Sequence, residues 1–239
     1  MAWSSEIQAV IDRDFPSHAH PYRILERTIL EHVGPGAVVL DIGCGRRAPN
    51  LMKLEGRAGT LIGIDIVDFE VSAPDLALFN ESVFDMRSIV TGTVDVAYSR
   101  SVMEHLDNVD AAYAEIHRVL KPAGKYIFLT PNFWDYTSLI SYVVPNFLHG
   151  RLVRFAEGRA ERDTFPTFYR SNTYYRISRD SRKYRLAIQS FQYLGQYPSA
   201  FLFNNLMFRA AARYEKFLGR HEHLQFLRGW ILCVLSKDA

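Results

Sequence analysis

Four short apolar runs lie in the first half of the chain, and none of them alternates apolar with polar residues. They cover residues 37–40, 60–64, 93–98 and 125–129, and a weaker run covers 76–79. Such runs suit strands that are covered on both faces, as in a parallel sheet. Helices are expected at 5–15, 21–33 and 109–120, the last with Asp107 as its cap. The alternation predicts an α/β fold, with a Rossmann-like, mostly parallel sheet and helices on both faces.

The second part of the chain is less regular. Residues 131–170 show no steady period, 184–193 alternate like a strand, 200–218 have a helical pattern, and 226–235 fit an antiparallel last strand. No internal repeat or clean linker is visible. We therefore expect one domain over 1–239, with N-terminal helices in 1–36, a cofactor-binding core in 37–132, a lid or substrate insertion in 133–183, and strands and a helix that complete the sheet in 184–239.

A glycine-rich loop, VVLDIGCGRRAPN, follows the first apolar run. On spacing alone it fits the G-x-G-x-x-G/A pattern of dinucleotide-binding loops, and Arg46 and Arg47 would suit a pyrophosphate. Asp41 argues against that reading, because a carboxylate two residues before the first glycine sits badly beside a pyrophosphate. It suits a ligand with an ammonium group, which it can bind through charge-assisted hydrogen bonds.

The second apolar run ends in Asp65, 24 residues beyond Asp41. An acid at this strand end can accept hydrogen bonds from two ribose hydroxyls. NAD-binding proteins use an acid in the same way, so Asp65 indicates an adenosine-type ligand without separating the two cofactors.

Four motifs in this order resemble those of class I S-adenosylmethionine-dependent methyltransferases: VVLDIGCG, IGIDIVD, DVAYSRSVMEHL and HRVLKPAGKYIFLTPN. Within that family the chain is most similar to the methyltransferase type 11 group, which includes the ubiquinone-pathway enzymes. The motifs span about residues 37–132, and the resemblance is weak after 133, where such families choose substrates. It implies a methyltransferase that uses S-adenosylmethionine. Arg47 departs from the pattern, because many members carry a third glycine there.

The resemblance implies cofactor contacts for Asp41, Gly43, Cys44, Gly45, Asp65, Ile66, Asp85, Met86 and Ser99. The glycine loop and Ser99 would hold the methionine part, and Asp65 would bind the ribose hydroxyls. Ile66 would pack on the adenine, while Asp85 would accept from its amino group with Met86 beside it.

Two residues are candidates for a general base. His105 would lie over the transferring methyl group, and histidine is suited to proton transfer near neutral pH. A structural role, in which its ring binds backbone, is the alternative. Asp163 is the second candidate. Glu104 and His105 match a pair that helps hold a divalent metal in some ubiquinone-pathway O-methyltransferases, but no further acid is placed to complete a site, so we predict no metal.

Charge is distributed unevenly along the chain. Residues 1–130 hold 12 Lys and Arg against 18 Asp and Glu, whereas the remainder holds 16 against 8. A basic second part suits an anionic acceptor. We therefore expect O-methylation of an anionic or nucleotide-linked small molecule, such as a sugar or natural-product intermediate, with Glu104, Tyr169 and Arg170 as acceptor contacts.

Other partners and functions remain as alternatives. An NAD-dependent oxidoreductase and a non-catalytic cofactor-binding protein are the rivals. Nucleic acid is not expected, because no RNA-binding motif is present. Residues 138–155 and 200–220 place apolar residues beside arginines, as at a membrane surface, but core helices share that pattern and membrane contact is not favoured. The two cysteines and the absence of a signal peptide predict a cytoplasmic protein. The sequence makes no prediction of oligomeric state.

Overall fold

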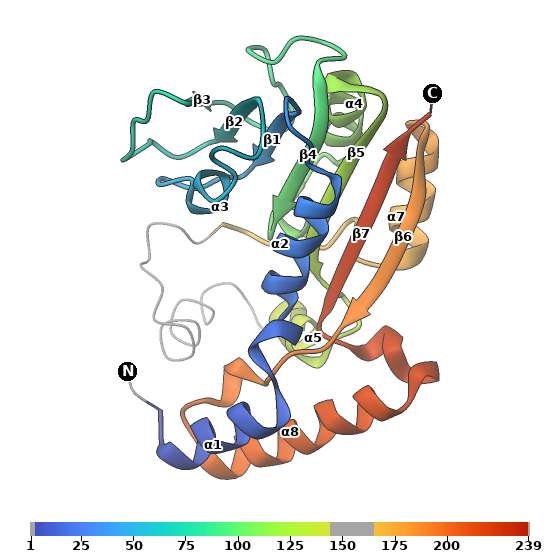
Figure 1. Cartoon of the computed structure of the whole chain (residues 1–239). Helices are drawn as coiled ribbons and strands as arrows, with labels where there is room; N and C mark the ends of the chain where they lie inside the picture. The colour runs from blue at the N-terminus through green and yellow to red at the C-terminus, as the bar shows by residue number, and fades with distance from the viewer. Residues whose placement is uncertain (1–2, 144–164, 239) are drawn as a thin grey trace. The chain divides into compact units, whose positions relative to one another are not determined.

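A seven-stranded sheet organises the computed structural model, which describes residues 3–143 and 165–238 (Figure 1). The strands are β1 (Val38–Ile42), β2 (Thr60–Asp65), β3 (Leu76–Asn80), β4 (Val94–Arg100), β5 (Leu120–Pro131), β6 (Leu186–Leu194) and β7 (Trp230–Lys237). Their order across the sheet is β3-β2-β1-β4-β5-β7-β6.

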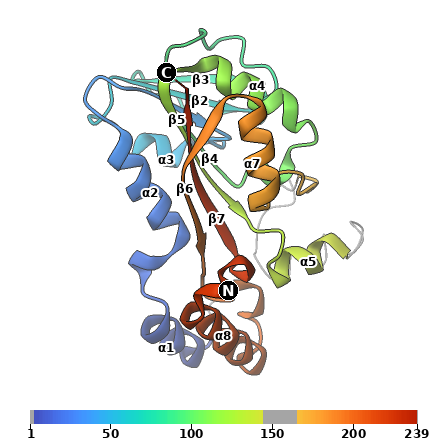
Figure 2. The same cartoon turned by 90° about the vertical axis from the view of Figure 1, so that its right-hand side faces the viewer.

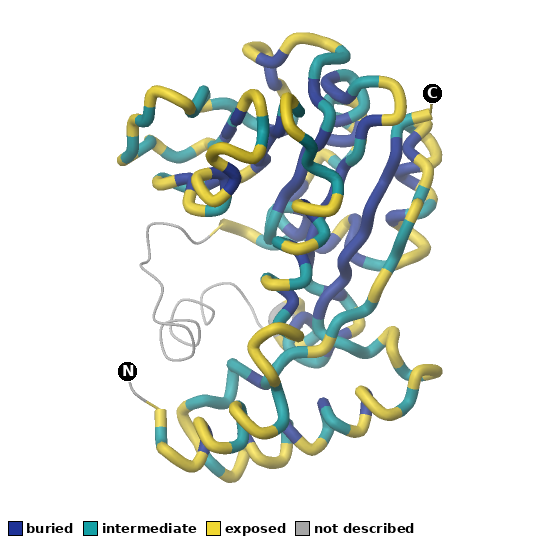
Figure 3. The backbone as a smooth tube through the Cα atoms, viewed as in Figure 1, coloured by how far each residue is buried: buried dark blue, intermediate teal, exposed yellow. Residues whose placement is uncertain are grey.

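Most neighbouring strands run parallel. β1 pairs in parallel with β2 and with β4, and the β2–β3 and β4–β5 pairs are also parallel. The arrow of β7 runs opposite to that of β6 in Figure 1. Strands β4, β5 and β7 are mostly buried along their length (Figure 3). The predicted mostly parallel sheet with an antiparallel last strand is therefore confirmed.

The described helices are α1 (Ser5–Asp14), α2 (Pro21–His32), α3 (Pro49–Met52), α4 (Val109–Val119), α5 (Tyr136–Val143), α7 (Tyr174–Lys183) and α8 (Asn205–Arg220). Helices lie on both faces of the sheet, as predicted. Figure 2 shows α2 on one side of the sheet and α4 and α7 on the other. Tyr113 of α4 stacks on Tyr184, which follows α7, with ring centroids 6.3 Å apart.

Three local predictions were wrong. The cap of α4 is Asn108, whose side chain accepts from the Ala111 N–H at 3.1 Å, rather than Asp107. The pattern at 200–218 begins too early, because Asn204 caps α8 through the N–H groups of Leu206 and Met207. The last strand begins at Trp230, because residues 222–227 form a 3₁₀ helix. In each case local hydrogen bonds fix the residue at which the helix or strand begins, and the spacing of apolar residues carries no information about those bonds.

In the described part of the aperiodic stretch, residues 136–143 form helix α5, and α7 follows the stretch, capped by Thr173. Apolar spacing is weak in α7, because most of its residues are polar and Ile177 is its one buried apolar residue. Residues 144–164 of the expected lid, with the candidate base Asp163, lie outside the described residues.

Contacts divide the chain into two compact units. Unit 1 comprises Met1–Ile24, Pro131–Thr167 and Tyr193–Ile231, and unit 2 comprises Leu25–Thr130, Phe168–Gln192 and Leu232–Ala239. In unit 1, α1 packs on α8 through Ile7, Phe208 and Ala212. Unit 2 holds β1 to β4 and most of the other three strands. The expectation of a single functional domain over 1–239, with the subdivisions given above, stays a prediction.

Candidate functional site

The predicted cofactor residues gather at one edge of the sheet in unit 2. Because β1, β2 and β4 are parallel neighbours, their carboxyl ends meet at that edge. This brings Asp41, Asp65 and Ser99 together, each at or near the end of its strand. In open parallel sheets, ligands bind outside the carboxyl ends of the strands.

The glycine loop after β1 needs glycine at two positions. Gly43 and Gly45 have φ angles of +77° and +75°, in the left-handed region that glycine adopts without strain. A Cβ atom on Gly43 would also lie 2.4 Å from Cγ2 of Val102. At Gly45 a Cβ atom would meet no described atom within 4 Å. The backbone at Gly45 therefore borders open space that a ligand can approach.

Asp41 is a buried acid beneath this loop, with 2% of its surface exposed. Its Oδ2 accepts a hydrogen bond of 2.9 Å from the Tyr98 hydroxyl. Burial raises the pKa of Asp41 to about 7, although the Tyr98 hydrogen bond and the charge of Arg100 oppose the rise. A cation placed beside this buried carboxyl group would favour its ionised form, because the opposite charge offsets the cost of burial. Arg100 did not stand out in the sequence.

Asp65 ties the loop to β2. Its Oδ2 accepts from the Gly45 N–H at 2.7 Å, and its Oδ1 accepts from the Val67 N–H at 3.2 Å. Each oxygen retains a second lone pair for a hydroxyl donor. Ile66 follows Asp65 with 58% of its surface exposed, which leaves an apolar face available beside the loop. Cys44 lies buried in the loop, where burial raises the pKa of its thiol to about 12.

The two arginines of the loop face the segment after β2. Arg46 donates to the Asp68 carbonyl at 3.2 Å, and Arg47 pairs with Glu70 at 2.9 Å. Ala48, with φ +43°, is the left-handed residue of this turn and precedes the first residue of α3. Arg47 is outside the left-handed region, so the backbone does not require the third glycine that many similar proteins carry there.

Two of the predicted adenine contacts, Asp85 and Met86, differ in exposure. Asp85 is exposed and forms an ion pair with Arg87, whereas Met86 is fully buried. The Asp85 N–H donates to the Ser82 carbonyl at 3.0 Å, which makes a tight turn. The Asp85 carboxylate therefore lies on the surface, while the buried Met86 side chain holds this segment against the core.

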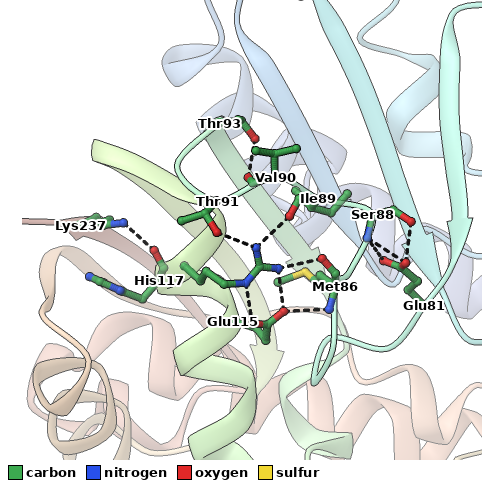
Figure 4. Close-up of polar contacts among 11 residues, drawn as sticks. Glu81, Met86, Ser88, Ile89, Val90, Thr91, Thr93, Glu115, His117 and Lys237 are labelled. Carbon is green, nitrogen blue, oxygen red and sulfur yellow. Dashed lines mark hydrogen bonds and ion pairs between the residues drawn. The ribbon is translucent and has the colours of Figure 1, made fainter.

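Helix α4 holds the segment that follows Met86 (Figure 4). Arg118 donates to the carbonyls of Met86 and Ile89 at 2.8 and 2.9 Å, and to the Thr91 hydroxyl at 3.1 Å. Glu115 pairs with Arg118 at 2.7 Å and accepts from the Met86 N–H at 2.8 Å. We call these contacts of Arg118 and Glu115 with residues 86–91 the Arg118 clasp, which sequence reasoning missed. Its one signal is an acid and an arginine three residues apart on a helix, which face each other.

We expect Arg118→Met to destabilise the fold by roughly 2–4 kcal/mol, because it leaves two carbonyls and the Glu115 carboxylate without their donor. It should also weaken S-adenosylhomocysteine binding, since the segment with Asp85 is no longer fixed. Urea unfolding and calorimetry measure both effects. Arg182→Met, at an exposed position of α7, is the matched control. Equal stability of the two variants would contradict the role given to the clasp.

Ser99 lies below the surface of the site. Its hydroxyl is fully buried and lies 2.7 Å from the Tyr126 hydroxyl, which donates to the Met103 sulfur at 3.3 Å. Two residues after Ser99, the backbone of Ser101 lies in the left-handed region, with φ +57°. Its backbone N–H donates to the Leu129 carbonyl at 2.9 Å, which fixes the turn after β4.

The short 3₁₀ helix Met103–His105 presents the Glu104–His105 pair. Glu104 is buried, and its Oε2 accepts from the Thr130 hydroxyl at 3.0 Å. Nε2 of His105 lies 3.9 Å from Oε1 of Glu104, and 29% of the His105 side chain is exposed. A partly exposed imidazole beside a fixed carboxylate is placed to accept a proton and to be stabilised once it is charged.

Two predicted acceptor contacts lie beside this pair. The Glu104 carbonyl accepts from the N–H groups of Phe168 and Tyr169 at 2.7 and 3.2 Å. Arg170 donates to the Asp107 carbonyl, and its guanidinium lies 5.5 Å from the centre of the Phe168 ring. Tyr169 is buried, with φ +50°, so its ring packs inward, whereas the Arg170 side chain is exposed.

The described residues contain neither a candidate metal site nor a helix that could span a membrane. No group of three or more His, Cys, Asp or Glu side chains within residues 3–143 and 165–238 is arranged to hold a metal ion. In the same ranges, every helix is too short or too polar to cross a bilayer.

Comparison with known proteins locates the family resemblance in unit 2. Residues 40–128 match the family model described as a methyltransferase domain. The chain is 28% identical over 123 residues to 24-methylenesterol C-methyltransferase 2 of Arabidopsis thaliana, covering 46% of this chain and 34% of that protein. It is 32% identical over 125 residues to malonyl-[acyl-carrier protein] O-methyltransferase of Methylovorus, covering 45% and 41%. The chain thus spans about a third of the first relative and two fifths of the second.

Solved structures share the fold over nearly the whole chain. Geranyl diphosphate C-methyltransferase from Streptomyces coelicolor aligns with a TM-score of 0.55 and 14% identity, covering 90% of this chain and 79% of that one. The 1,6-didemethyltoxoflavin-N1-methyltransferase of Burkholderia thailandensis aligns with a TM-score of 0.58 and 16% identity, covering 100% and 92%. At these identities the likeness shows a common fold.

Proposed function

We propose that the protein is a class I methyltransferase, whose residues 40–128 match the methyltransferase domain, and that it transfers a methyl group from S-adenosylmethionine to a small-molecule acceptor. The observation that carries this proposal is the buried acid Asp41 beneath an open glycine loop. A pyrophosphate would be repelled by a carboxylate there, whereas the ammonium group of S-adenosylmethionine would pair with it.

The residues of the site fit the proposed cofactor. Asp41 would bind the ammonium group, and the loop backbone at Gly45 would approach the methionine part closely. Asp65 has lone pairs for the ribose hydroxyls, and exposed Ile66 offers an apolar surface to the adenine. The exposed Asp85 carboxylate would accept from the adenine amino group once its pairing with Arg87 is exchanged. Ser99 would act below the surface, by fixing Tyr126 beneath the methionine pocket.

Bound S-adenosylmethionine supplies an electrophilic methyl group on a sulfonium, so the protein needs mainly to align the acceptor and remove a proton. Alignment can supply up to roughly 7–11 kcal/mol of the barrier, and a general base about 10²–10⁴-fold in rate. For a hydroxyl acceptor, the O–C bond would form as the S–C bond to the methyl group breaks, which releases S-adenosylhomocysteine, and the His105 imidazole would take the hydroxyl proton. The Glu104 carboxylate, 3.9 Å away, stabilises the imidazolium.

For the acceptor, we propose an anionic small molecule that is methylated at oxygen. The exposed Arg170 beside the Glu104–His105 pair supports a negative charge on the acceptor. One relative is named as an O-methyltransferase of a malonyl group, and one structural neighbour was solved with geranyl diphosphate. The nucleotide-linked sugar expected from composition gains no support from these names.

C-methylation of an isoprenoid is the second candidate. The names of several relatives favour it, including sterol 24-C-methyltransferases from Gibberella zeae and Schizosaccharomyces pombe. In that chemistry an alkene carbon accepts the methyl group, and a base then removes a proton from the resulting carbocation. The Glu104–His105 pair would serve either acceptor, so only the substrate separates the two.

A methyl-transfer screen tests the proposal. The full chain is incubated with S-adenosylmethionine and geranyl diphosphate, a sterol, a malonyl thioester, a phenol or a sugar phosphate, and release of S-adenosylhomocysteine is measured. We expect release with an anionic acceptor, and mass spectrometry then distinguishes O- from C-methylation. Calorimetry provides the contrary outcome: binding of NAD, with no binding of S-adenosylhomocysteine, would overturn the proposal in favour of an oxidoreductase.

A further inference from the structure

The outer face of α8, within unit 1, combines arginines with exposed apolar side chains. At about 100° per residue, Arg209, Arg213 and Arg220 lie within about 40° of one another around the helix, and Leu206 and Phe217 lie next to them. All three arginines are exposed, and Leu206 and Phe217 have 79% and 49% of their surfaces exposed. The opposite face of α8, with Phe208, Ala212 and Leu218, is buried. We call these five exposed residues the α8 outer face.

The three arginines form no ion pair or side-chain hydrogen bond with any residue in 3–143 or 165–238. The neighbouring Lys216 differs, because it pairs with Asp14 at 3.0 Å. Arg209 and Arg213 are four residues apart, a spacing at which like charges destabilise a helix. Arg209 and Arg213 therefore repel each other, whereas Arg220 lies in the last turn of α8, where a positive charge suits the helix dipole. The excess of positive charge on this face suits an anionic partner.

Two hollows lie along this face, and the arginines of α8 line them. A groove of about 620 Å³ between α1 and α8 is lined by five basic residues, Arg13, Arg209, Arg213, Lys216 and Arg220, and by two acids, Glu6 and Asp14. Asp14 pairs with Arg13 and with Lys216. A second hollow of about 370 Å³ is lined by Asn205, Leu206, Arg209, Ala210 and Arg213. Arg209 and Arg213 border both, and each hollow has room for a phosphate group.

We propose that the α8 outer face docks the protein on an anionic bilayer surface. The three arginines bind lipid phosphates, and Leu206 and Phe217 enter the headgroup region. Membrane-surface helices combine basic and apolar residues in this way. A single-stranded nucleic acid would require several stacking aromatics along the arginines, and Phe217 is the one exposed aromatic side chain in the described length of α8. The proposal goes beyond methyl transfer and does not depend on it.

Sequence alone did not favour membrane contact at 200–220, because a buried helix with the same composition would look identical. The structure adds which residues of this helix are exposed. It buries one face of α8 and leaves its arginines, with Leu206 and Phe217, on the other.

Vesicle co-sedimentation of the full chain tests the proposal. We expect binding to phosphatidylcholine vesicles that contain phosphatidylglycerol and weak binding to phosphatidylcholine alone. The variant R209Q/R213Q/R220Q should lose roughly 100-fold in binding, at about 5-fold for each basic residue near an anionic surface. L206S/F217S should retain part of the binding at low salt and lose more at raised salt, where charge attraction is screened.

A control variant with the same change in net charge, R27Q/R57Q/R182Q, carries its substitutions at exposed positions of unit 2. It should bind as the unchanged chain does, and circular dichroism confirms that all variants are folded. Equal losses in the two triple variants would overturn the proposal, as would equal binding to neutral vesicles. Tighter binding of single-stranded RNA than of vesicles, abolished by R209Q/R213Q/R220Q, would replace it with a nucleic-acid surface.

Discussion

Replacing Asp41 with asparagine should weaken binding of S-adenosylhomocysteine by roughly 30-fold to 5,000-fold. Removing one partner of a buried, hydrogen-bonded charge pair costs about 2–5 kcal/mol. Asparagine keeps the shape of aspartate and still offers an oxygen to the Tyr98 hydroxyl, so the fold should persist. Calorimetry measures the loss. Asp75→Asn, which removes an exposed carboxylate from unit 2, is the control and should bind normally.

The pH dependence of binding gives this prediction a second readout. In the free protein, burial raises the pKa of Asp41 to about 7, and a bound ammonium group would lower that pKa. The cofactor therefore favours ionised Asp41, and affinity should fall as pH drops below about 7, by at most about tenfold per pH unit. Asp41→Asn should abolish this slope. A variant that keeps both the affinity and the slope would show that Asp41 does not hold the ammonium group.

The same raised pKa affects stability in the opposite direction. Between the ordinary aspartate pKa of 3.8 and about 7, the folded protein keeps a proton on Asp41 that the unfolded chain has lost. The contribution of Asp41 to the free energy of unfolding therefore falls as pH rises through that window. Empty protein should thus be relatively less stable at neutral pH, and cofactor binding should restore the loss.

Replacing His105 with alanine should lower kcat by about 10²–10⁴-fold while binding of S-adenosylhomocysteine changes little. A general base acts on the proton of the acceptor, and the cofactor contacts proposed here come from other residues. His105→Gln should be almost as slow, because glutamine forms hydrogen bonds but accepts no proton near neutral pH. Steady-state kinetics with the acceptor found in the screen measures both variants.

His18→Ala, at an exposed position in unit 1, controls for loss of a histidine in general. Unchanged turnover in His105→Ala would remove the base role and leave the structural role. A loss of cofactor affinity equal to the loss of kcat would show that His105 positions the cofactor rather than the proton.

The sheet could be predicted because both faces of its central strands are covered, which leaves unalternating apolar runs in the sequence. The placement of Asp41 and Asp65 followed from the strand ends, since parallel neighbours end at a common edge. The Arg118 clasp could not be predicted in this way, because it joins residues about 30 positions apart through side-chain contacts that no period reports. The departure at Arg47 also needed the structure for its explanation, because the left-handed residue of the turn is Ala48 and not Arg47.

Asp65 performs two tasks with one carboxylate, since it holds the Gly45 N–H and is the proposed acceptor for ribose. A change at this position would therefore alter nucleoside recognition and loosen the loop at the same time. Redirecting the protein to another nucleoside cofactor would require a paired change, in which a second group takes over the Gly45 N–H before Asp65 is replaced. If Asp65 also binds the ribose, a single substitution at this strand end would disturb the loop as well as the recognition of the nucleoside.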